Sequence, residues 1–338
     1  MKENFLNYIP LKIYRFLRWQ LSERKNYFYN KNNFSKEYAQ ICYNVDKVVR
    51  KNVSREIFLA MRAKKDSYII KYLEDLCRDV IEKYKDKSEI CSSSLVNKEK
   101  KIWVFWWAGE DMAPDIVKAC IKSIRKNSSG HEVVMLDKNN YQNYISLSKI
   151  IIEKHNKGII GHAHFSDLIR LTLLAQYGGM WIDATVFISQ PLPPSIFNMW
   201  FYTAKTLNQK SVFFSKSRWC GYFLAGNSNF PLFSFARDCL TIYWESENAI
   251  IDYLLMDYIF ELAYENIVVV RNTIDNLPDN NFKRGVLMSS INETYSKELF
   301  DVLATQETFV SKLSWRYGNP QLKTRDGKMS NYGYLLKL

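Results

Sequence analysis

Strand-like and helix-like stretches alternate between residues 101 and 187, and this alternation limits the chain to few folds. The short apolar or aromatic runs are typical of buried strands, and the stretches between them carry apolar residues at helical spacing. Alternation of this kind predicts an α/β fold in which helices connect the parallel strands of a sheet. In order, the expected elements are a strand at 101–107, a helix at 114–127, a strand at 131–137, a helix at 163–177 and a strand at 180–187.

The first hundred residues show a different pattern. The stretch 54–84 carries apolar residues at three- and four-residue spacing and contains no glycine or proline, which predicts long helices. This part is also basic, because residues 1–100 hold 22 Lys and Arg against 13 Asp and Glu, and so account for nine of the chain's twelve excess positive charges. A polar segment at 85–100 follows. We therefore expect a basic helical region over residues 1–95 and a second domain over residues 96–338.

The cysteines and the opening residues indicate where the protein acts. Six cysteines lack the close spacing of zinc or redox motifs, and no secretory signal is present, as in reduced cytosolic proteins. Residues 1–21 mix apolar side chains with Lys12, Arg15 and Arg18, which suits an anionic membrane surface. The alternative is an amphipathic helix packed on its own domain. No uncharged run reaches the roughly 18 residues of a membrane span. We expect a cytoplasmic protein attached peripherally to the inner face of the membrane.

A single carboxylate stands at the end of an expected strand. Asp183 follows the apolar pair Trp181-Ile182, and ligands of α/β sheets bind at the carboxyl ends of the strands. The alternative is a turn aspartate that accepts hydrogen bonds from the backbone. Thr185, two positions later, is either a second polar ligand or a β-branched strand residue. The sequence favours a functional role for Asp183 because it is the first charged group after a buried strand.

Two further groups of residues are candidates for a site. Asp167 and Arg170 are three positions apart near the start of a helix and share one face, so they form either a ligand-binding pair or an intrahelical ion pair. Trp106, Trp107 and Gly109 follow the first strand, where an indole beside a backbone turn could stack on a nucleotide base or could belong to the core. No zinc-binding histidine pattern, Ser-His-Asp order or phosphate-binding glycine loop is visible.

Together these motifs resemble a known family. The segments IWVFWWAGEDMAPDIVKACIKSI, HFSDLIRLTLLAQYGGMWIDATVF and IIDYLLMDYIF are similar to those of the bacterial capsular polysaccharide synthesis glycosyltransferases. That family is related to the glycosyltransferases with a DXD-containing sugar-binding motif. The resemblance covers roughly residues 100 to 265. Its specific part is the order SDLIR, Gly178-Gly179 and Asp183, whereas each piece alone is common.

The resemblance implies a GT-A (Rossmann-like) fold and a role for each candidate residue. Trp106, Trp107 and Gly109 would lie beside the nucleobase and ribose of a nucleotide-sugar. Asp167 and Arg170 would bind hydroxyls of the donor sugar and, with Asp183, form the catalytic set. Asp183 matches the first DXD aspartate. Thr185 stands at the last DXD position, which is normally a metal ligand. A divalent cation, Mn²⁺ or Mg²⁺, is therefore expected on Asp183 and Thr185, because these ions take oxygen ligands.

The expected activity is transfer of a sugar from a nucleotide-sugar, with a UDP-sugar as the favoured donor. The resemblance further implies retention of the anomeric configuration. It implies a polyprenyl-diphosphate-linked or growing capsular oligosaccharide as acceptor, bound by the C-terminal segment. One alternative is a catalytically impaired carbohydrate-binding or scaffold protein, which would fit threonine at position 185. A nucleic-acid binder would fit the basic first third, but no nucleic-acid-binding motif is present, so no nucleic-acid partner is expected.

Overall fold

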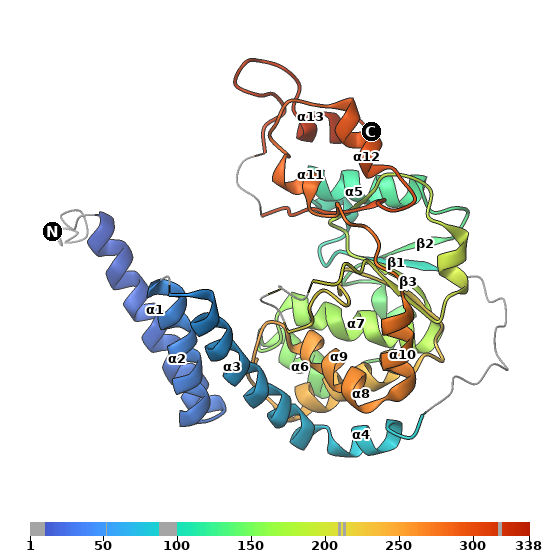
Figure 1. Cartoon of the computed structure of the whole chain (residues 1–338). Coiled ribbons are helices and arrows are strands. Elements are labelled where there is room, and N and C mark those ends of the chain that lie inside the picture. The colour runs from blue at the N-terminus through green and yellow to red at the C-terminus, as the bar shows by residue number, and fades with distance from the viewer. Residues whose placement is uncertain (1–10, 52, 88–99, 209–210, 212–213, 317–319) are drawn as a thin grey trace. The chain divides into compact units, whose positions relative to one another are not determined.

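The structure is a computed structural model that describes the chain except residues 1–10, 52, 88–99, 209–210, 212–213 and 317–319 (Figure 1). The chain forms two compact units. The first contains the helices up to Leu76 together with Glu247–Leu255, and the second contains Cys77–Ser246 and Met256–Leu338. The predicted boundary between residues 95 and 96 lies outside the described residues and stays a prediction.

Over its described residues the first unit is built from three long helices, as the apolar spacing predicts. They are α1 (Leu11–Asn33), α2 (Lys36–Lys51) and α3 (Arg55–Leu76). The segment Glu247–Leu255 joins this unit through polar contacts. Lys65 forms an ion pair with Asp252 at 2.6 Å, and the Tyr72 hydroxyl donates to Glu247 at 2.6 Å. Neither the main chain of residues 1–10 nor the side chains of residues 11–21 are among the described parts, so the membrane-surface prediction stays untested.

The second unit contains a five-stranded sheet in the order β2-β1-β3-β6-β5. β1 pairs in parallel with both β2 and β3, whereas β6 pairs antiparallel with β3 and β5. The expected α/β class with parallel strands is therefore confirmed, and the sheet is mixed. The strands are β1 (Ile102–Phe105), β2 (Val133–Leu136), β3 (Gly179–Ile182), β5 (Phe201–Thr203) and β6 (Phe223–Gly226).

Two crossover helices cover the two faces of the parallel part. α5 (Asp115–Lys126) connects β1 to β2, and α7 (His162–Tyr177) precedes β3. The two crossovers run in opposite directions along the sheet, and right-handed connections therefore place α5 and α7 on opposite faces, as Figure 1 shows. The other helices of this unit are α4 (Arg78–Tyr84), α6 (Lys149–Asn156), α8 (Pro231–Ser246), α9 (Leu255–Asn266), α10 (Val268–Asn276), α11 (Val286–Ser289), α12 (Lys297–Leu303) and α13 (Asn331–Leu335), with short 3₁₀ turns at Glu110–Met112, Tyr141–Asn143 and Pro194–Asn198.

Gly178 and Gly179 form the turn from α7 into β3. Both have positive φ, 67° and 88°, which side chains with a Cβ rarely adopt. A Cβ on Gly179 would also lie 2.4 Å from the carbonyl oxygen of Lys101. The predicted helix end therefore depends on glycine for two reasons, and it fixes where β3 and the residues after it begin.

The strand expected over 180–187 is wrong in one respect, because the structure divides it in two. β3 ends at Ile182, and Val186–Ile188 form β4, which pairs antiparallel with β7 (Val310–Lys312) in a separate two-stranded sheet. The amide of Asp183 still donates to the carbonyl of Tyr222, but the amide of Val186 donates back to the carbonyl of Asp183. This turn takes the chain out of the large sheet at Asp183-Ala184-Thr185.

Candidate active site

Asp183 lies at the carboxyl edge of the parallel strands. It directly follows β3, and Trp106 directly follows β1, the parallel neighbour of β3. The two positions therefore share one edge of the sheet, which is where α/β proteins bind their ligands. The side chain of Asp183 is 26% exposed, so its carboxylate is reachable from solvent.

Every oxygen of the Asp183 carboxylate accepts a hydrogen bond. Oδ1 accepts from Nη2 of Arg170 at 3.1 Å and from the indole Nε1 of Trp181 at 2.9 Å. Oδ2 accepts from Nζ of Lys312 at 2.9 Å. One carboxylate is thus held between two cations of the chain. We call Asp167, Arg170, Asp183, Thr185 and Lys312 the Asp183 cluster.

Arg170 joins the predicted pair to Asp183. Its Nη1 donates to Asp167 Oδ1 at 3.0 Å, while its guanidinium lies over the ring of Trp181 with 4.9 Å from Cζ to the ring centre. The side chain is buried, and its Nε has no hydrogen-bond partner among the described residues. Asp167 and Arg170 therefore do form an intrahelical ion pair, and the same guanidinium also binds Asp183. A buried Arg held by two carboxylates is fixed in one orientation.

Lys312 is a member of the cluster that the sequence did not reveal. It is the last residue of β7, where it pairs with Val186 of β4, and its Nζ donates to the hydroxyl of Thr185 at 2.6 Å as well as to Asp183. Nζ also lies 5.1 Å from the ring centre of Tyr222. Its place depends on pairing between strands that are more than a hundred residues apart, for which the sequence around Lys312 carries no local signal.

Gly221 is a second residue that sequence patterns did not indicate. A Cβ at this position would lie 3.0 Å from Nη1 of Arg170 and 2.3 Å from Cε of Met256. The glycine therefore allows the guanidinium to approach the backbone closely.

The two cations determine the charge state of Asp183. Burial alone would raise the pKa of this carboxyl group, but the positive charges of Lys312 and Arg170, together with the hydrogen bonds from Trp181 and Lys312, lower the pKa to about 2. Asp183 is therefore ionised throughout the physiological range. The two carboxylates and two cations of the cluster compensate each other in charge.

The donor groups of the cluster do not fit a divalent cation. Both oxygens of Asp183 already bind N–H groups, and Thr185 Oγ1 contacts the ammonium of Lys312. Among the described residues, no group of three His, Cys, Asp or Glu side chains is placed to hold a metal ion. The predicted Mn²⁺ or Mg²⁺ remains untested. The group that contacts both Asp183 and Thr185 is the ammonium of Lys312.

The predicted base-binding residues lie at the same sheet edge but contact other aromatic side chains. Trp107 stacks on His162 with 4.9 Å between ring centres and forms a T-shaped pair with His155 with 4.7 Å between ring centres. Trp106 makes an edge contact with Trp315 at 5.8 Å. Both indoles are partly exposed. Gly109 has φ of 83°, and a Cβ there would lie 3.4 Å from Asp137 Oδ2.

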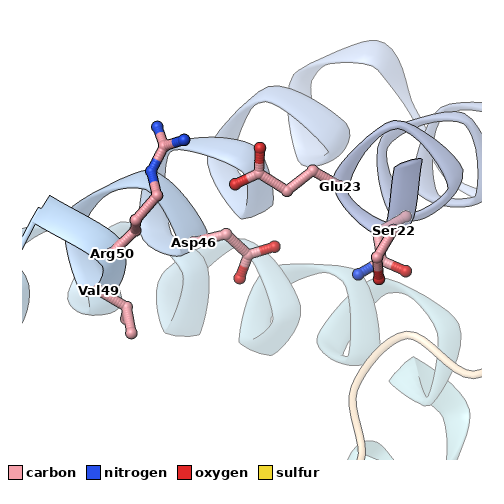
Figure 2. Close-up of a pocket in the computed structure, with 6 residues that line it drawn as sticks. Ser22, Glu23, Asp46, Val49 and Arg50 are labelled. Carbon is pink, nitrogen blue, oxygen red and sulfur yellow. The ribbon is translucent and has the colours of Figure 1, made fainter. Parts of the chain in front are cut away.

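The first unit contains a pocket of about 420 Å³ (Figure 2). Glu23 of α1 points toward Arg50 and Asp46 of α2. None of the predicted site residues lies in it. Its lining consists of Ser22, Glu23, Asn26, Asp46, Val49 and Arg50.

None of the helices in the described part of the chain has the length and apolar character needed to cross a membrane.

The fold is thus an α/β protein in which a buried arginine of α7 and a lysine of β7 both bind an aspartate at the carboxyl edge of the parallel strands. The family is shown by sequence comparison: this chain belongs to the capsular polysaccharide synthesis proteins, whose family model matches residues 47–332. The predicted resemblance to this family is thereby confirmed. The chain is also 32% identical over 102 residues to a protein from Annulohypoxylon truncatum named O-glycosyltransferase braB. That match covers 28% of this chain and 24% of the fungal protein.

Proposed function

We propose that this protein is a glycosyltransferase of GT-A type that moves a sugar from a nucleotide-sugar to a capsular oligosaccharide. The observation that carries the proposal is that the buried guanidinium of Arg170 binds both Asp167 and Asp183 at the carboxyl edge of the sheet. Family membership and the glycosyltransferase name of the fungal relative support it. The proposed donor is a UDP-sugar, and the proposed acceptor is a polyprenyl-diphosphate-linked or growing oligosaccharide.

The cluster has the groups that such a reaction needs. Carboxylate oxygens accept hydrogen bonds from sugar hydroxyls, and the Asp167 side chain keeps 15% of its surface exposed. Fixed positive groups stabilise the negative charge that develops on a departing diphosphate. Transfer with retention would place the acceptor hydroxyl on the same side of the sugar as the departing diphosphate. The proposed site of action is the inner face of the cell membrane, with residues 1–21 on the lipid surface.

A panel of nucleotides and nucleotide-sugars tests the proposal. A bound donor stabilises the folded state by mass action, so the matching UDP-sugar should raise the melting temperature, and release of UDP should follow when acceptor is added. Asp167→Asn should reduce the shift given by the sugar donor at a fixed donor concentration. Asp301→Asn is the matched control, because Asp301 forms an exposed ion pair with Lys297 outside the cluster. If no nucleotide-sugar shifts the melting temperature or releases nucleotide, the proposal is wrong. Binding without turnover would instead favour a carbohydrate-binding scaffold protein.

A further inference from the structure

We propose that the ammonium group of Lys312 takes the place of a divalent cation at this site and binds the diphosphate of the donor directly. The proposal rests on the glycosyltransferase function proposed above. It assigns Lys312 as a catalytic residue and makes sugar transfer independent of metal ions.

The first observation is which atoms Lys312 contacts. Its Nζ lies 2.9 Å from Asp183 Oδ2 and 2.6 Å from Thr185 Oγ1. Asp183 and Thr185 are the two positions of the Asp-Ala-Thr segment that would correspond to metal ligands. One ammonium therefore bridges both ligand positions, with an oxygen from each. A metal ion on these oxygens would have to displace the ammonium or lie beside a like charge.

The second observation is that Lys312 is fixed by backbone pairing and not only by its side chain. Its amide donates to the carbonyl of Arg284 at 2.8 Å, and the amide of Leu313 donates to the carbonyl of Thr185 at 2.9 Å. Pairing of β7 with β4 places Lys312 opposite Val186, directly after the Asp-Ala-Thr turn. The strand pair thus fixes the backbone of Lys312 beside the motif, and the hydrogen bonds to Asp183 and Thr185 orient its ammonium group.

The third observation is the hydrogen-bonding capacity that remains on the ammonium of Lys312. A lysine ammonium has three N–H donors and no acceptor. Asp183 and Thr185 take two of them, and the side chain of Lys312 remains 33% exposed. The third donor is therefore available to a phosphate oxygen at the open side of the cluster. The buried Arg170 donates to the other carboxylate oxygen of Asp183, Oδ1, so the carboxylate stays in place when a diphosphate binds.

The chemical step balances without a metal. The acceptor hydroxyl oxygen forms a bond to the anomeric carbon while the bond from that carbon to the diphosphate oxygen breaks. The electron pair of the broken bond stays on the diphosphate oxygen, and the hydroxyl proton passes to the departing diphosphate. The ammonium of Lys312 donates its hydrogen bond to the diphosphate as the negative charge grows, which is the role of a fixed electrostatic group in transfer reactions.

The test measures transfer and donor hydrolysis by the full chain in EDTA and in Mn²⁺. We expect wild-type rates that agree within twofold in the two conditions, and a melting-temperature shift with UDP that EDTA does not change. Lys312→Met keeps the side-chain length and removes the charge, so it should lower kcat at least 100-fold. Lys312→Arg should recover part of the loss. Lys297→Met is the matched control, because Lys297 belongs to an exposed ion pair, and it should keep wild-type rates.

The outcomes separate the two proposals. If wild-type transfer stops in EDTA and returns with Mn²⁺, the role of Lys312 is wrong while the glycosyltransferase function stands. A folded Lys312→Met protein with wild-type kcat would likewise refute the role of Lys312 and leave the glycosyltransferase function standing. If Lys312→Met fails to fold, the wild-type EDTA comparison and the Lys312→Arg variant still decide. Absence of transfer, hydrolysis and ligand-induced stabilisation in both conditions would overturn the proposed function and this inference together.

Discussion

Lys312 and Asp183 are 129 positions apart in the chain, and Nζ of Lys312 donates to Oδ2 of Asp183 at 2.9 Å. This ion pair joins the small two-stranded sheet to the edge of the large one, since Lys312 ends β7 and Asp183 follows β3. Arg170 binds the other oxygen of the same carboxylate. The properties of the site therefore depend on how one aspartate is shared between two cations.

Replacing Asp183 by Asn should be costly for both stability and activity. The substitution removes one of the two carboxylates that bind the buried Arg170, and it removes the counter-charge of Lys312. Removing one partner of a fully buried ion pair costs about 3 kcal/mol or more, and the loss should be smaller here because Asp183 is partly exposed and Arg170 keeps Asp167. We expect this loss in the free energy of unfolding measured with urea, and a loss of transfer of at least 100-fold in protein that remains folded. Near-normal activity would show that the active centre is placed wrongly.

The lowered pKa of Asp183 predicts a specific pH dependence. Its folded pKa of about 2 lies below the ordinary value of 3.8, so its ionised form stabilises the folded state. This contribution, on the order of 2 kcal/mol, is fully present above about pH 4 and is lost as the pH falls through 4 to 2. Unfolding free energies between pH 5 and pH 2 should therefore fall less steeply in Asp183→Asn than in the wild type. Equal slopes would contradict the assignment.

Asp167 should distinguish the donor sugar from its nucleotide. If its carboxylate binds sugar hydroxyls, Asp167→Asn should weaken binding of the UDP-sugar about tenfold or more and leave the affinity for UDP nearly unchanged. Isothermal titration with both ligands measures this difference. If Asp167 serves only as the ion-pair partner of Arg170, both affinities will fall together.

A substitution at Thr185, combined with one at Lys312, should replace the ammonium of the site by a divalent metal ion. The double variant Lys312→Met, Thr185→Asp removes the ammonium and places two carboxylates at positions 183 and 185, an arrangement that suits Mn²⁺ or Mg²⁺. We expect its residual transfer to require Mn²⁺, whereas Lys312→Met alone should not respond to the metal. Rates measured across a Mn²⁺ titration test this. Equal rates of the double variant in EDTA and in Mn²⁺ would contradict the expectation.

Residues 1–21 should determine lipid binding. Their mixture of apolar and basic side chains predicts attachment to anionic vesicles that weakens at high salt. A variant that begins at residue 22 should co-sediment at least fivefold less with such vesicles than the full chain, and neither protein should bind neutral vesicles strongly. Equal sedimentation of the two would show that the first 21 residues do not make the contact.

Local sequence patterns predicted much of the second unit. The helix at 163–177 and the glycine pair after it correspond to α7 and to two positive-φ positions, because helical periodicity and chain turns are decided within a few residues. The division of 180–187 into two strands was not predictable in this way. Val186–Ile188 are as apolar as Met180–Ile182, and what separates them is pairing with β7 far along the chain.

The composition of the site was predictable only in part. Asp167, Arg170, Asp183 and Thr185 lie within one continuous segment, so a motif could indicate them together. Lys312 could not be found, since one lysine among many basic residues carries no signal until strand pairing places it. The sequence does not distinguish the two interpretations of Trp107, base stacking and core packing. Its contacts with His155 and His162 show that packing accounts for at least part of its surface.

The segment Glu247–Leu255 has a practical consequence for anyone who wishes to divide this protein. The chain leaves the second unit after Ser246, contributes nine residues to the first, and returns at Met256. Tyr38 of α2 donates to the carbonyl of Ile251 at 2.5 Å, and both side chains are buried. No single cut can therefore produce two complete halves. Deleting the N-terminal helices would remove the packing partners of Ile251 and expose an apolar side chain, so a fragment limited to the second unit requires redesign of this short return segment.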